Sequence, residues 1–477
     1  MAKRLGVSSQ LVSGVLRGVE VLAGYGFSGL NDGSDALAEE EKALEASRQA
    51  FAPVLQARLQ ARIDVVDEHN AGQAICPTCG ERGLSKGRVT RTVTSLFGDV
   101  VLTRRWNRCG KHKGGWSEAE RQLHIPSGKY TARLSESMTL MATVTSHGAA
   151  ERLCHRLLGI QVSEHAIQDA VEERAEVVVR LQDRDAEQLR PVEEDGRLRV
   201  VERPSDAVAT APDIAYMEVD GVVPMTRELD PERSKPVTGH RGGKGLRYIM
   251  EGKEVKNAVL YRGDQCCTEG DDRGVVLEKH YVSHLGYWKN FAALVWARLV
   301  RLRFDESNIL ILLSDGALWI RQLAEYFPLT VILILDLFHA KHRIWEVANA
   351  MYGDGTAKAR NWANLQCNRV EAGQVAKVIA ALKRLQPKRR VAEKLVDALA
   401  TYFDNNKDRM DYPTYRANGW RVSSGGVESA NYHVTGARLK MQGMRWSEKG
   451  AAEMARLRAD LANDVWRQRT LEVLAAA

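Results

Sequence analysis

The sequence predicts a multidomain α/β protein in which helical N-terminal regions and a β-ribbon precede a sheet covered by helices. Three observations predict this fold class. Short β-like segments fill residues 72–125, apolar strand-like segments alternate with helical ones from residue 207 onward, and helical periodicity dominates residues 348–413. Apolar strands separated by helices indicate a sheet buried on both faces. The 477 residues are enough for two or three domains with hydrophobic cores.

The composition is that of an ordinary globular protein. Hydrophobic residues make up 44% of the chain, and its net charge is +7. No apolar run approaches the length of a membrane span, and the N-terminal stretch lacks the continuous apolar segment of a secretory signal. We therefore expect a cytoplasmic protein with no membrane partner. The seven cysteines, an odd number, argue against a disulfide framework.

Residues 1–71 are expected to form a helical N-terminal region. The first 34 residues lack a clean hydrophobic period and predict a weakly helical or mobile segment. Asp35 suits the N-cap of a helix that runs toward Glu68, and Pro53 predicts a break or kink near Ala52. One apolar stripe recurs every fourth residue: Phe51, Leu55, Leu59 and Ile63. The stripe favours packing within the chain, and the alternative is a dimer contact.

Two pairs of metal-ligand residues mark residues 72–125. Cys76 and Cys79 are separated by two residues and followed by a glycine that permits a tight turn around an ion. Cys109 and His112 repeat the spacing thirty residues later. Two such knuckles joined by a hairpin predict a zinc ribbon with a structural Zn²⁺ in a closed Cys3His site. His112 is the weakest ligand, because His124 could replace it.

The segment between the knuckles is basic, and its pattern predicts a β-hairpin that turns at Phe97-Gly98-Asp99. Its arginines are candidate phosphate contacts: Arg88, Arg91, Arg104, Arg105 and Arg108. Strands of a ribbon would hold them rigidly, as contacts to a DNA backbone require. The alternative is a solvated basic face without a ligand.

Residues 126–206 are predicted to be helical and to end in a charged linker over residues 183–206. Segments 149–158 and 163–176 look like a helix-turn-helix with Leu157 and Ile160 in its shared core. The second helix is acidic and would repel phosphate, so a plain helical packing unit is an equally good interpretation. If this unit contacts DNA, Arg152 and Arg156 are its better contacts.

Three acidic residues stand at strand ends or at a helix start: Asp220, Asp315 and Glu428. Carboxylates at the C-terminal ends of strands can converge on one crevice. Because uncompensated negative charges repel, convergence would require divalent cations, and hard oxygen ligands suit Mg²⁺ or Mn²⁺. Each Asp-Gly pair taken alone could equally be a turn. Asp336 also follows a strand-like segment and could replace Asp315 as second metal ligand.

From Cys76 to about Leu461 the chain resembles bacterial insertion-sequence transposases of the ISKra and ISLre type, which are related to the Mutator-like group. The resemblance is carried by the paired knuckles, Val219-Asp220-Gly221, Leu335-Asp336-Leu337-Phe338-His339, and Gly426-Val427-Glu428 with the downstream Arg438, Met444, Arg445, Trp446 and Ser447. The poorly patterned first 34 residues depart from it.

The resemblance implies a DDE transposase with an RNase H-like mixed sheet flanked by helices. Such enzymes cut DNA at transposon ends and join the free 3′ ends to target DNA. The resemblance assigns Asp220, Asp315 and Glu428 to the acidic triad that binds Mg²⁺ or Mn²⁺, and Asp336 and His339 to a D-x-x-H pair. From the residues alone, a packing role is nearly as good an interpretation of His339.

The resemblance also implies a catalytic core in two parts, residues 207–347 and 414–477, separated by a helical insertion over residues 348–413. The insertion carries a basic cluster that we expect to contact DNA: Lys388, Arg389 and Arg390. The expected partner is double-stranded DNA, both the terminal inverted repeats and the target, and we expect a nucleoid-associated homodimer. Two alternatives stay open: an RNase H-like nuclease or resolvase without strand transfer, and a domesticated DNA-binding protein without catalysis.

Overall fold

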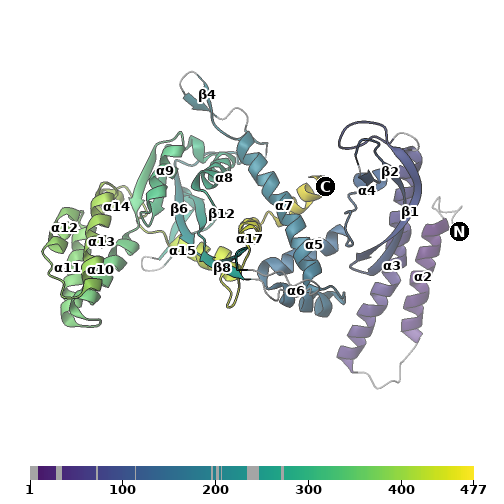
Figure 1. Ribbon diagram of the computed structural model, residues 1–477, viewed down its shortest axis with the longest axis horizontal. Coiled ribbons are helices and arrows are strands. Elements are labelled where there is room, and N and C mark those ends of the chain that lie inside the picture. Colours follow the sequence, from purple (N-terminus) through teal and green to yellow (C-terminus); the bar gives the residue numbers. More distant parts are fainter. Residues whose placement is uncertain are drawn as a thin grey trace. The chain divides into compact units, whose positions relative to one another are not determined.

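The computed structural model describes residues 9–27, 35–70, 74–112, 114–194, 197–199, 203–205, 207–233, 247–269 and 273–476. The chain forms two compact units, Met1–Val177 with Arg467–Ala477 and Val178–Trp466 (Figure 1). The border between them lies within one continuous helix, Glu164–Gln188. No helix of the described residues combines the length and the apolar character needed to cross a membrane.

The first unit contains a helical pair, a three-stranded β-ribbon and a group of helices. In chain order its elements are α2 (Ser9–Phe27), α3 (Ala36–His69), β1 (Leu84–Ser95), β2 (Gly98–Arg108), β3 (Gly115–Trp116), α4 (Glu118–Gln122), α5 (Ala132–Val144), α6 (His147–Leu153), the π-helix η1 (Cys154–Leu158), α7 (Glu164–Gln188) and α18 (Trp466–Ala476).

The first 34 residues, expected to be weakly helical or mobile, are helical where the structure describes them. Residues 9–27 form the regular helix α2, whereas residues 1–8 and 28–34 lie outside the described part. A Cβ added at Gly14 would lie 2.6 Å from the Cβ of Ala57, so glycine permits the close approach of α2 to α3. Asp35 caps α3 as predicted, accepting the Ala38 N–H at 2.8 Å, and Pro53 does not end the helix.

The hairpin predicted between the knuckles is confirmed by β1 and β2, which pair from Leu84↔Arg108 to Ser95↔Gly98. The apolar stripe of α3 packs on this ribbon: Ile63 is buried with Val93, Val100 and Leu102, and Leu55 and Leu59 pack against the same cluster. Packing within the chain is therefore confirmed for this part of the stripe, whereas Phe51 is half exposed.

The helix-turn-helix segment contains an irregularity that the sequence did not predict. Helix α6 passes into the π-helix η1, which ends at Gly159 with φ +63°. Ile160 is buried as expected, but Leu157 is exposed, so its assignment to a shared core was wrong. The wider turn of η1 shifts the register of the apolar side chains by one position, which rotates Leu157 toward solvent.

The second unit is built on a five-stranded mixed sheet. Its elements in chain order are β4 (Val192–Glu194), β5 (Arg197–Arg199), β6 (Ile214–Val222), β7 (Met225–Leu229), β8 (Tyr248–Gly252), β9 (Val255–Arg262), the 3-10 helix η2 (Gly263–Gln265), β10 (Cys266–Glu269), β11 (Arg273–Val276), β12 (His280–Leu285), α8 (Trp288–Arg301), the 3-10 helix η3 (Phe304–Glu306), β13 (Ile309–Ser314), α9 (Leu318–Tyr326), β14 (Val331–Leu335), α10 (Leu337–Tyr352), α11 (Ala357–Glu371), α12 (Val375–Lys383), α13 (Arg390–Asn406), the 3-10 helix η4 (Lys407–Arg409), α14 (Tyr412–Ala417), α15 (Gly425–Ala430), the π-helix η5 (Asn431–Gly436), α16 (Ala437–Leu439) and α17 (Glu448–Ala462).

The sheet has the strand order β12-β9-β6-β13-β14. Strands β12, β9 and β6 are antiparallel neighbours, and β6, β13 and β14 are parallel neighbours. Parallel strands need crossover connections, which α8 and α9 provide. Three of the strand-like segments predicted from residue 207 onward, at 214–223, 309–313 and 331–335, are thereby confirmed, and they are adjacent in the sheet.

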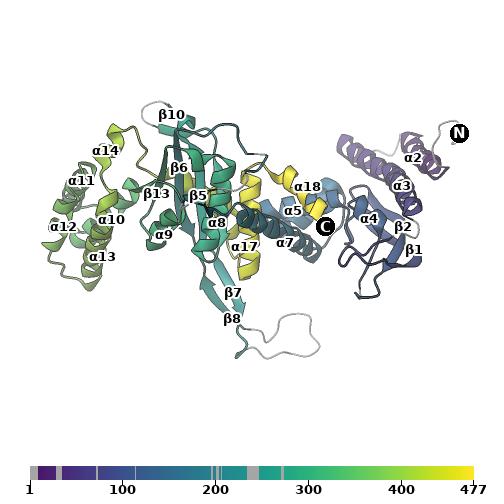
Figure 2. The same ribbon diagram turned by 90° about the horizontal axis from the view of Figure 1, so that it is seen from above.

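The two faces of the sheet carry separate apolar cores. Alternate residues of β6 point to opposite faces of the sheet. Met217 and Val219 pack with α8 and α9, whereas Tyr216 packs with α10 and the helices that follow it. Helices α11, α12 and α13 form a group beside α10, as both views show (Figures 1 and 2). The helical structure predicted over residues 348–413 is thereby confirmed.

Three details differ from the sequence prediction. The sequence pattern of residues 246–261 suggests a hairpin, and this prediction is wrong for the described residues: β8 pairs with β7 and β9 pairs with β6. The two strand pairs follow one another in a long ribbon that projects from the sheet (Figure 2). The expected linker of residues 183–206 begins as the last turns of α7. The sequence pattern after Glu428 predicts one final helix, but this helix is interrupted, with η5 and a loop before α17.

Candidate metal sites in the ribbon and at the sheet edge

The four predicted zinc ligands come together in the ribbon. Hydrogen bonds fold the first knuckle into a tight turn, from the Gly80 N–H to the Cys76 carbonyl and from the Cys76 N–H to the Glu81 carbonyl. Gly80 has φ +73°, a conformation that glycine adopts without strain. Cys109 lies at the end of β2, so the hairpin delivers the second knuckle to the first.

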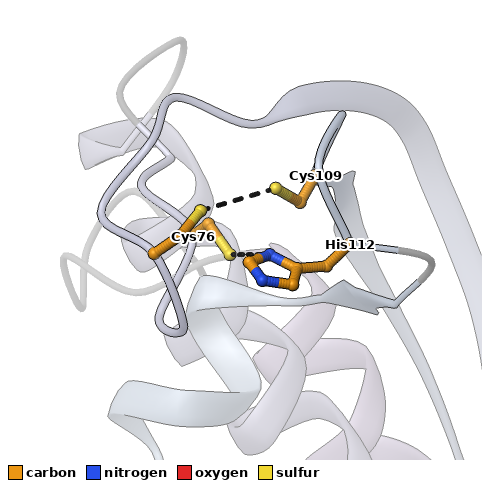
Figure 3. A group of neighbouring side chains, drawn as sticks. Cys76, Cys109 and His112 are labelled. Carbon is orange, nitrogen blue, oxygen red and sulfur yellow. Dashed lines mark hydrogen bonds between the residues drawn. The ribbon is translucent and has the colours of Figure 1, made fainter.

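The ligand atoms are arranged as a closed site (Figure 3). All four lie within 4.8 Å of one another. Sγ of Cys76 is 3.7 Å from Nδ1 of His112, and Sγ of Cys79 is 3.7 Å from Sγ of Cys109. Three thiolates and an imidazole at this spacing fit tetrahedral Zn²⁺, the donor set of a structural site.

The local electrostatics favour a deprotonated sulfur at Cys76. Desolvation raises the pKa of Cys76, but hydrogen bonds from the backbone N–H groups of Thr78 and Cys79 outweigh it and lower the pKa to about 6. Metal ligation requires the thiolate, so this lowered pKa suits a ligand. His124, the alternative ligand, instead donates from Nδ1 to the Leu474 carbonyl at 2.8 Å.

The arginines of the ribbon differ in how deeply they are buried and in how many contacts they make within the chain. Arg104 is buried, and its guanidinium lies 2.8 Å from Glu120. Arg91 also contacts Glu120, at 2.7 Å, and donates to the carbonyls of Ser127 and Gly128. The buried Glu120 thus holds two of the five predicted phosphate contacts in the interior of the ribbon.

The other basic residues predicted to contact DNA are more accessible. Arg88 is half exposed and forms an ion pair with Asp64. Arg105 is partly exposed and Arg108 exposed on β2. The remaining basic residues are exposed on helices or at the turn before α13: Arg152, Arg156, Lys388, Arg389 and Arg390. Their contact with DNA stays a prediction.

Three aspartates lie at equivalent positions on three adjacent parallel strands, each directly after a residue that pairs with the neighbouring strand. Val219 of β6 pairs with Ser314 of β13, and Ser314 pairs with Leu335 of β14. Asp220, Asp315 and Asp336 are the next residues in each strand direction. The register of the sheet therefore places them side by side at the carboxyl ends of its parallel strands, where α/β proteins bind ligands.

Glu428 reaches this edge from helix α15, which is fixed to β6. The buried carboxylate of Glu218 accepts the Val427 N–H at 2.8 Å and the Tyr261 hydroxyl at 2.6 Å. Asn431, at the start of η5, donates to Asp220 at 2.6 Å. Helix α15 is thus anchored on both sides of Glu428, whose side chain is 54% exposed and can turn toward the aspartates.

Asp336 is a buried helix cap. It is 1% exposed and caps α10, accepting the His339 N–H at 2.6 Å, and its other oxygen accepts the Ser424 hydroxyl at 2.7 Å. Burial acts to raise its pKa, but the donors of His339 and Ser424 outweigh burial and hold the pKa below the usual range. Because both of its oxygens are hydrogen-bonded, Asp315 is the better candidate for a second metal ligand.

His339 lies between the acidic residues. Its Nδ1 is 3.3 Å from an oxygen of Asp336 and 3.9 Å from an oxygen of Glu428. The Asp336 carboxylate, opposed by burial, raises the pKa of His339. The imidazole therefore keeps its proton to a higher pH than an ordinary histidine, and in the protonated form it offsets part of the negative charge at this edge.

The charge at this edge is not fully compensated. Burial, followed by the charges of Asp315 and Glu428, raises the pKa of Asp220 to about 6 although the Gly221 N–H and His339 oppose it. A divalent cation would relieve this repulsion, and the oxygen donors suit Mg²⁺ or Mn²⁺. Among the described residues, however, the ribbon cluster is the only group of three or more ligands already close enough to hold an ion. The acidic residues would have to turn toward one another.

Sequence reasoning missed the residues that position the acidic side chains. Glu218 shares the strand and the face of Asp220, so an acidic residue two positions before a candidate ligand was the available signal. Asn431 and Ser424 have no such signal, because their contacts depend on how α15 docks. Tyr402, whose hydroxyl donates to the Asp315 carbonyl at 2.7 Å, comes from a helix far along the chain.

A model of an uncharacterised protein family, UPF0236, matches residues 253–472, somewhat less than half of the chain. The matched residues include Asp315, His339 and Glu428, whereas Asp220 and the ribbon cluster lie outside them. No curated protein matches the chain. The chain is thus similar to this family over the later strands of the sheet and the helices that follow.

Proposed function

We propose that the chain is a DDE-type DNA transposase with an RNase H-like catalytic core, which binds the ends of an insertion sequence, cleaves them and joins the 3′ ends to target DNA. One observation carries the proposal. Asp220 and Asp315 stand at the same level on adjacent parallel strands, and Glu428 comes from a helix tied to the first of those strands by Glu218 and Asn431.

The topology of the sheet supports the RNase H-like assignment. An antiparallel meander of β6, β9 and β12 is extended on its other side by the parallel strands β13 and β14. This is the strand arrangement of RNase H-like nucleases. The helical group α11–α13 lies in the sequence between Asp315 and Glu428, where the resembling transposases carry an insertion.

The reaction consists of two phosphoryl transfers. In the first, the oxygen of water bonds to a phosphorus atom of the DNA, and the bond to the 3′ oxygen breaks to leave a 3′-hydroxyl and a 5′-phosphate. In the second, that 3′ oxygen bonds to a phosphorus of the target and displaces the target's own 3′ oxygen, which takes up a proton. Mg²⁺ or Mn²⁺, when bound, would supply the charge that activates one oxygen and stabilises the other.

The chain's own residues have separate parts in this scheme. Asp220, Asp315 and Glu428 would hold the cations, and Asn431 orients Asp220 through the 2.6 Å hydrogen bond. Asp336 fixes the start of α10 and the orientation of His339. His339, with its raised pKa, can donate a proton or a hydrogen bond to a phosphate oxygen.

Joining distinguishes a transposase from a nuclease. DNA flanking the reading frame is searched for inverted repeats, and a duplex that ends in one repeat is incubated with the full chain, Mg²⁺ and a supercoiled target. We expect covalent joining of the repeat's 3′ end to the target, absent with Glu428→Gln. Cleavage without joining would replace the transposase by a nuclease or resolvase, and DNA binding without cleavage would leave only a non-catalytic DNA-binding protein.

A further inference from the structure

A pocket of about 300 Å³ lies directly beside Asp315. It is formed where the turn after β13 meets α9, α10, α13 and η4. Its polar and charged lining includes Asp315, Arg321, Arg343, Tyr402, Asn406 and Arg409. Three guanidinium groups therefore gather at a carboxylate that the proposed function places among the metal ligands.

Arg409 is the most unusual of these groups. It is 2% exposed, and its guanidinium is held in place by hydrogen bonds from Nε to Asn406 at 2.6 Å and from Nη2 to the Gly316 carbonyl at 3.3 Å. Its buried Nη1 has no hydrogen-bond partner within the part of the chain that the structure describes. An unpaired N–H on a buried cation is costly, so the position calls for an acceptor within the pocket.

The two neighbouring arginines differ in how many of their N–H donors are already used in hydrogen bonds within the chain. Arg321 is bound by Asp408 at 2.7 and 2.9 Å and by the Asn405 carbonyl, so its charge is largely compensated. Arg343 lies over the ring of Tyr402, 4.3 Å from its centroid, a contact that leaves the edge of a guanidinium available for hydrogen bonds. Arg343 and Arg409 thus provide the donors that a ligand would use.

We propose that this pocket binds a phosphate group of the nucleic-acid backbone adjacent to the phosphate that reacts at Asp315. A phosphodiester offers two anionic oxygens to a guanidinium fork, the geometry for which arginine is better suited than lysine. The inference rests on the proposed function, because it takes its ligand from the same DNA. The helices after β14 then contribute directly to DNA binding, because α10 and η4 supply Arg343 and Arg409 and hold the strand next to the site of cleavage.

The test measures how DNA binding depends on salt. The full chain with its zinc is titrated into a fluorescent duplex of arbitrary sequence at several salt concentrations, without added divalent cation. We expect Arg343→Met and Arg409→Met each to lower the slope of log K against log salt by about one unit, as loss of one phosphate contact does. Lys407→Met is the matched control: Lys407 is exposed on the same η4 turn, paired with Asp404, and its loss should leave the slope unchanged.

The outcomes separate this inference from the proposed function. Slopes equal to wild type in both variants would overturn the pocket while DNA binding, and with it the proposed function, would stand. Absence of DNA binding by the wild type would overturn both. Inorganic phosphate is the second probe: if it raised the melting temperature of the wild type but not of Arg343→Met, while DNA slopes were unchanged, the ligand would be free phosphate rather than a backbone. If Arg409→Met fails to fold, Arg343→Met alone decides.

Discussion

The ribbon cluster and the acidic edge of the sheet are both candidate metal sites, yet they are built in opposite ways. The ribbon takes its ligands from two short knuckles, and their four ligand atoms already lie within 4.8 Å of one another. The acidic edge takes Asp220, Asp315 and Glu428 from three segments that lie far apart in the sequence. At this edge, burial and the repulsion between the carboxylates raise the pKa of Asp220 to about 6.

The difference follows from what each ion has to do. A structural Zn²⁺ gains most from a closed set of ligands that the local chain presents at once. A catalytic divalent cation must leave positions open for the reacting oxygens, so fewer protein ligands surround it. The side chain of Glu428, which is 54% exposed, is free to turn toward such an ion, whereas Asp220 is held in place by Asn431.

The largest effect is expected from breaking the closed site. Cys79→Ser removes one of four ligands, and because structural zinc contributes on the order of 10 kcal/mol to such folds, the variant should release the ion and unfold the ribbon. We expect about one equivalent of zinc in the wild type by metal analysis and little in the variant. Cys267→Ser, an exposed cysteine outside the cluster, is the control and should retain the metal. Stoichiometric zinc in Cys79→Ser would refute the site.

The next largest effect is expected at Glu218, which holds helix α15 and thereby Glu428 at the acidic edge. Glu218→Ala leaves the Val427 N–H and the Tyr261 hydroxyl buried without their acceptor, and each unsatisfied group costs about 1–3 kcal/mol. Burial raises the pKa of Glu218, so a neutral side chain is tolerated there and Glu218→Gln should lose much less stability. Urea unfolding measures both variants. Equal stability of Glu218→Ala and the wild type would show that α15 does not depend on this contact.

A moderate effect is expected from pH. In the folded chain Asp220 has a pKa of about 6, above its usual 3.8, so its contribution to stability is present below about pH 4 and is lost as pH rises through about 6. Without divalent cations, Asp220→Asn should therefore melt higher than the wild type above pH 6. Mn²⁺ should stabilise the wild type at that pH and leave Asp220→Asn unchanged.

The exposed Asp354→Asn is the control for this pH dependence and should follow the wild type. Equal Mn²⁺ stabilisation of Asp220→Asn and the wild type would contradict the acidic site.

The smallest effect concerns DNA contact by the ribbon. Arg105→Ala and Arg108→Ala should each lower the salt slope of DNA binding by about one unit, since these side chains are accessible on β2. Arg104→Ala should instead lower the stability of the ribbon, because it leaves the buried Glu120 with one partner fewer. An unchanged slope in the double variant of Arg105 and Arg108 would mean that the basic ribbon is only a solvated face.

Sequence patterns predicted the features that depend on residues close together in the sequence. The knuckle spacing was enough to predict the Cys3His cluster, and the apolar runs of β13 and β14 were enough to predict strands that end at Asp315 and Asp336. Local patterns could not predict the arrangement of β8 and β9, because which strands pair depends on contacts between distant segments. For the same reason they gave no indication that Asp336 would be a buried helix cap, or that Glu218 would fasten the helix of Glu428.

Cleavage of DNA by Glu428→Gln tests the central claim most directly. The wild type, Glu428→Gln and the control Glu393→Gln, an exposed glutamate in the first turn of α13, are incubated with supercoiled plasmid and Mn²⁺, and nicking rates are compared. We expect nicking by the wild type and the control, and a loss of about 100-fold or more in Glu428→Gln, because a metal ligand contributes several kcal/mol to such reactions. Nicking by Glu428→Gln at the wild-type rate would contradict a catalytic site built from Asp220, Asp315 and Glu428.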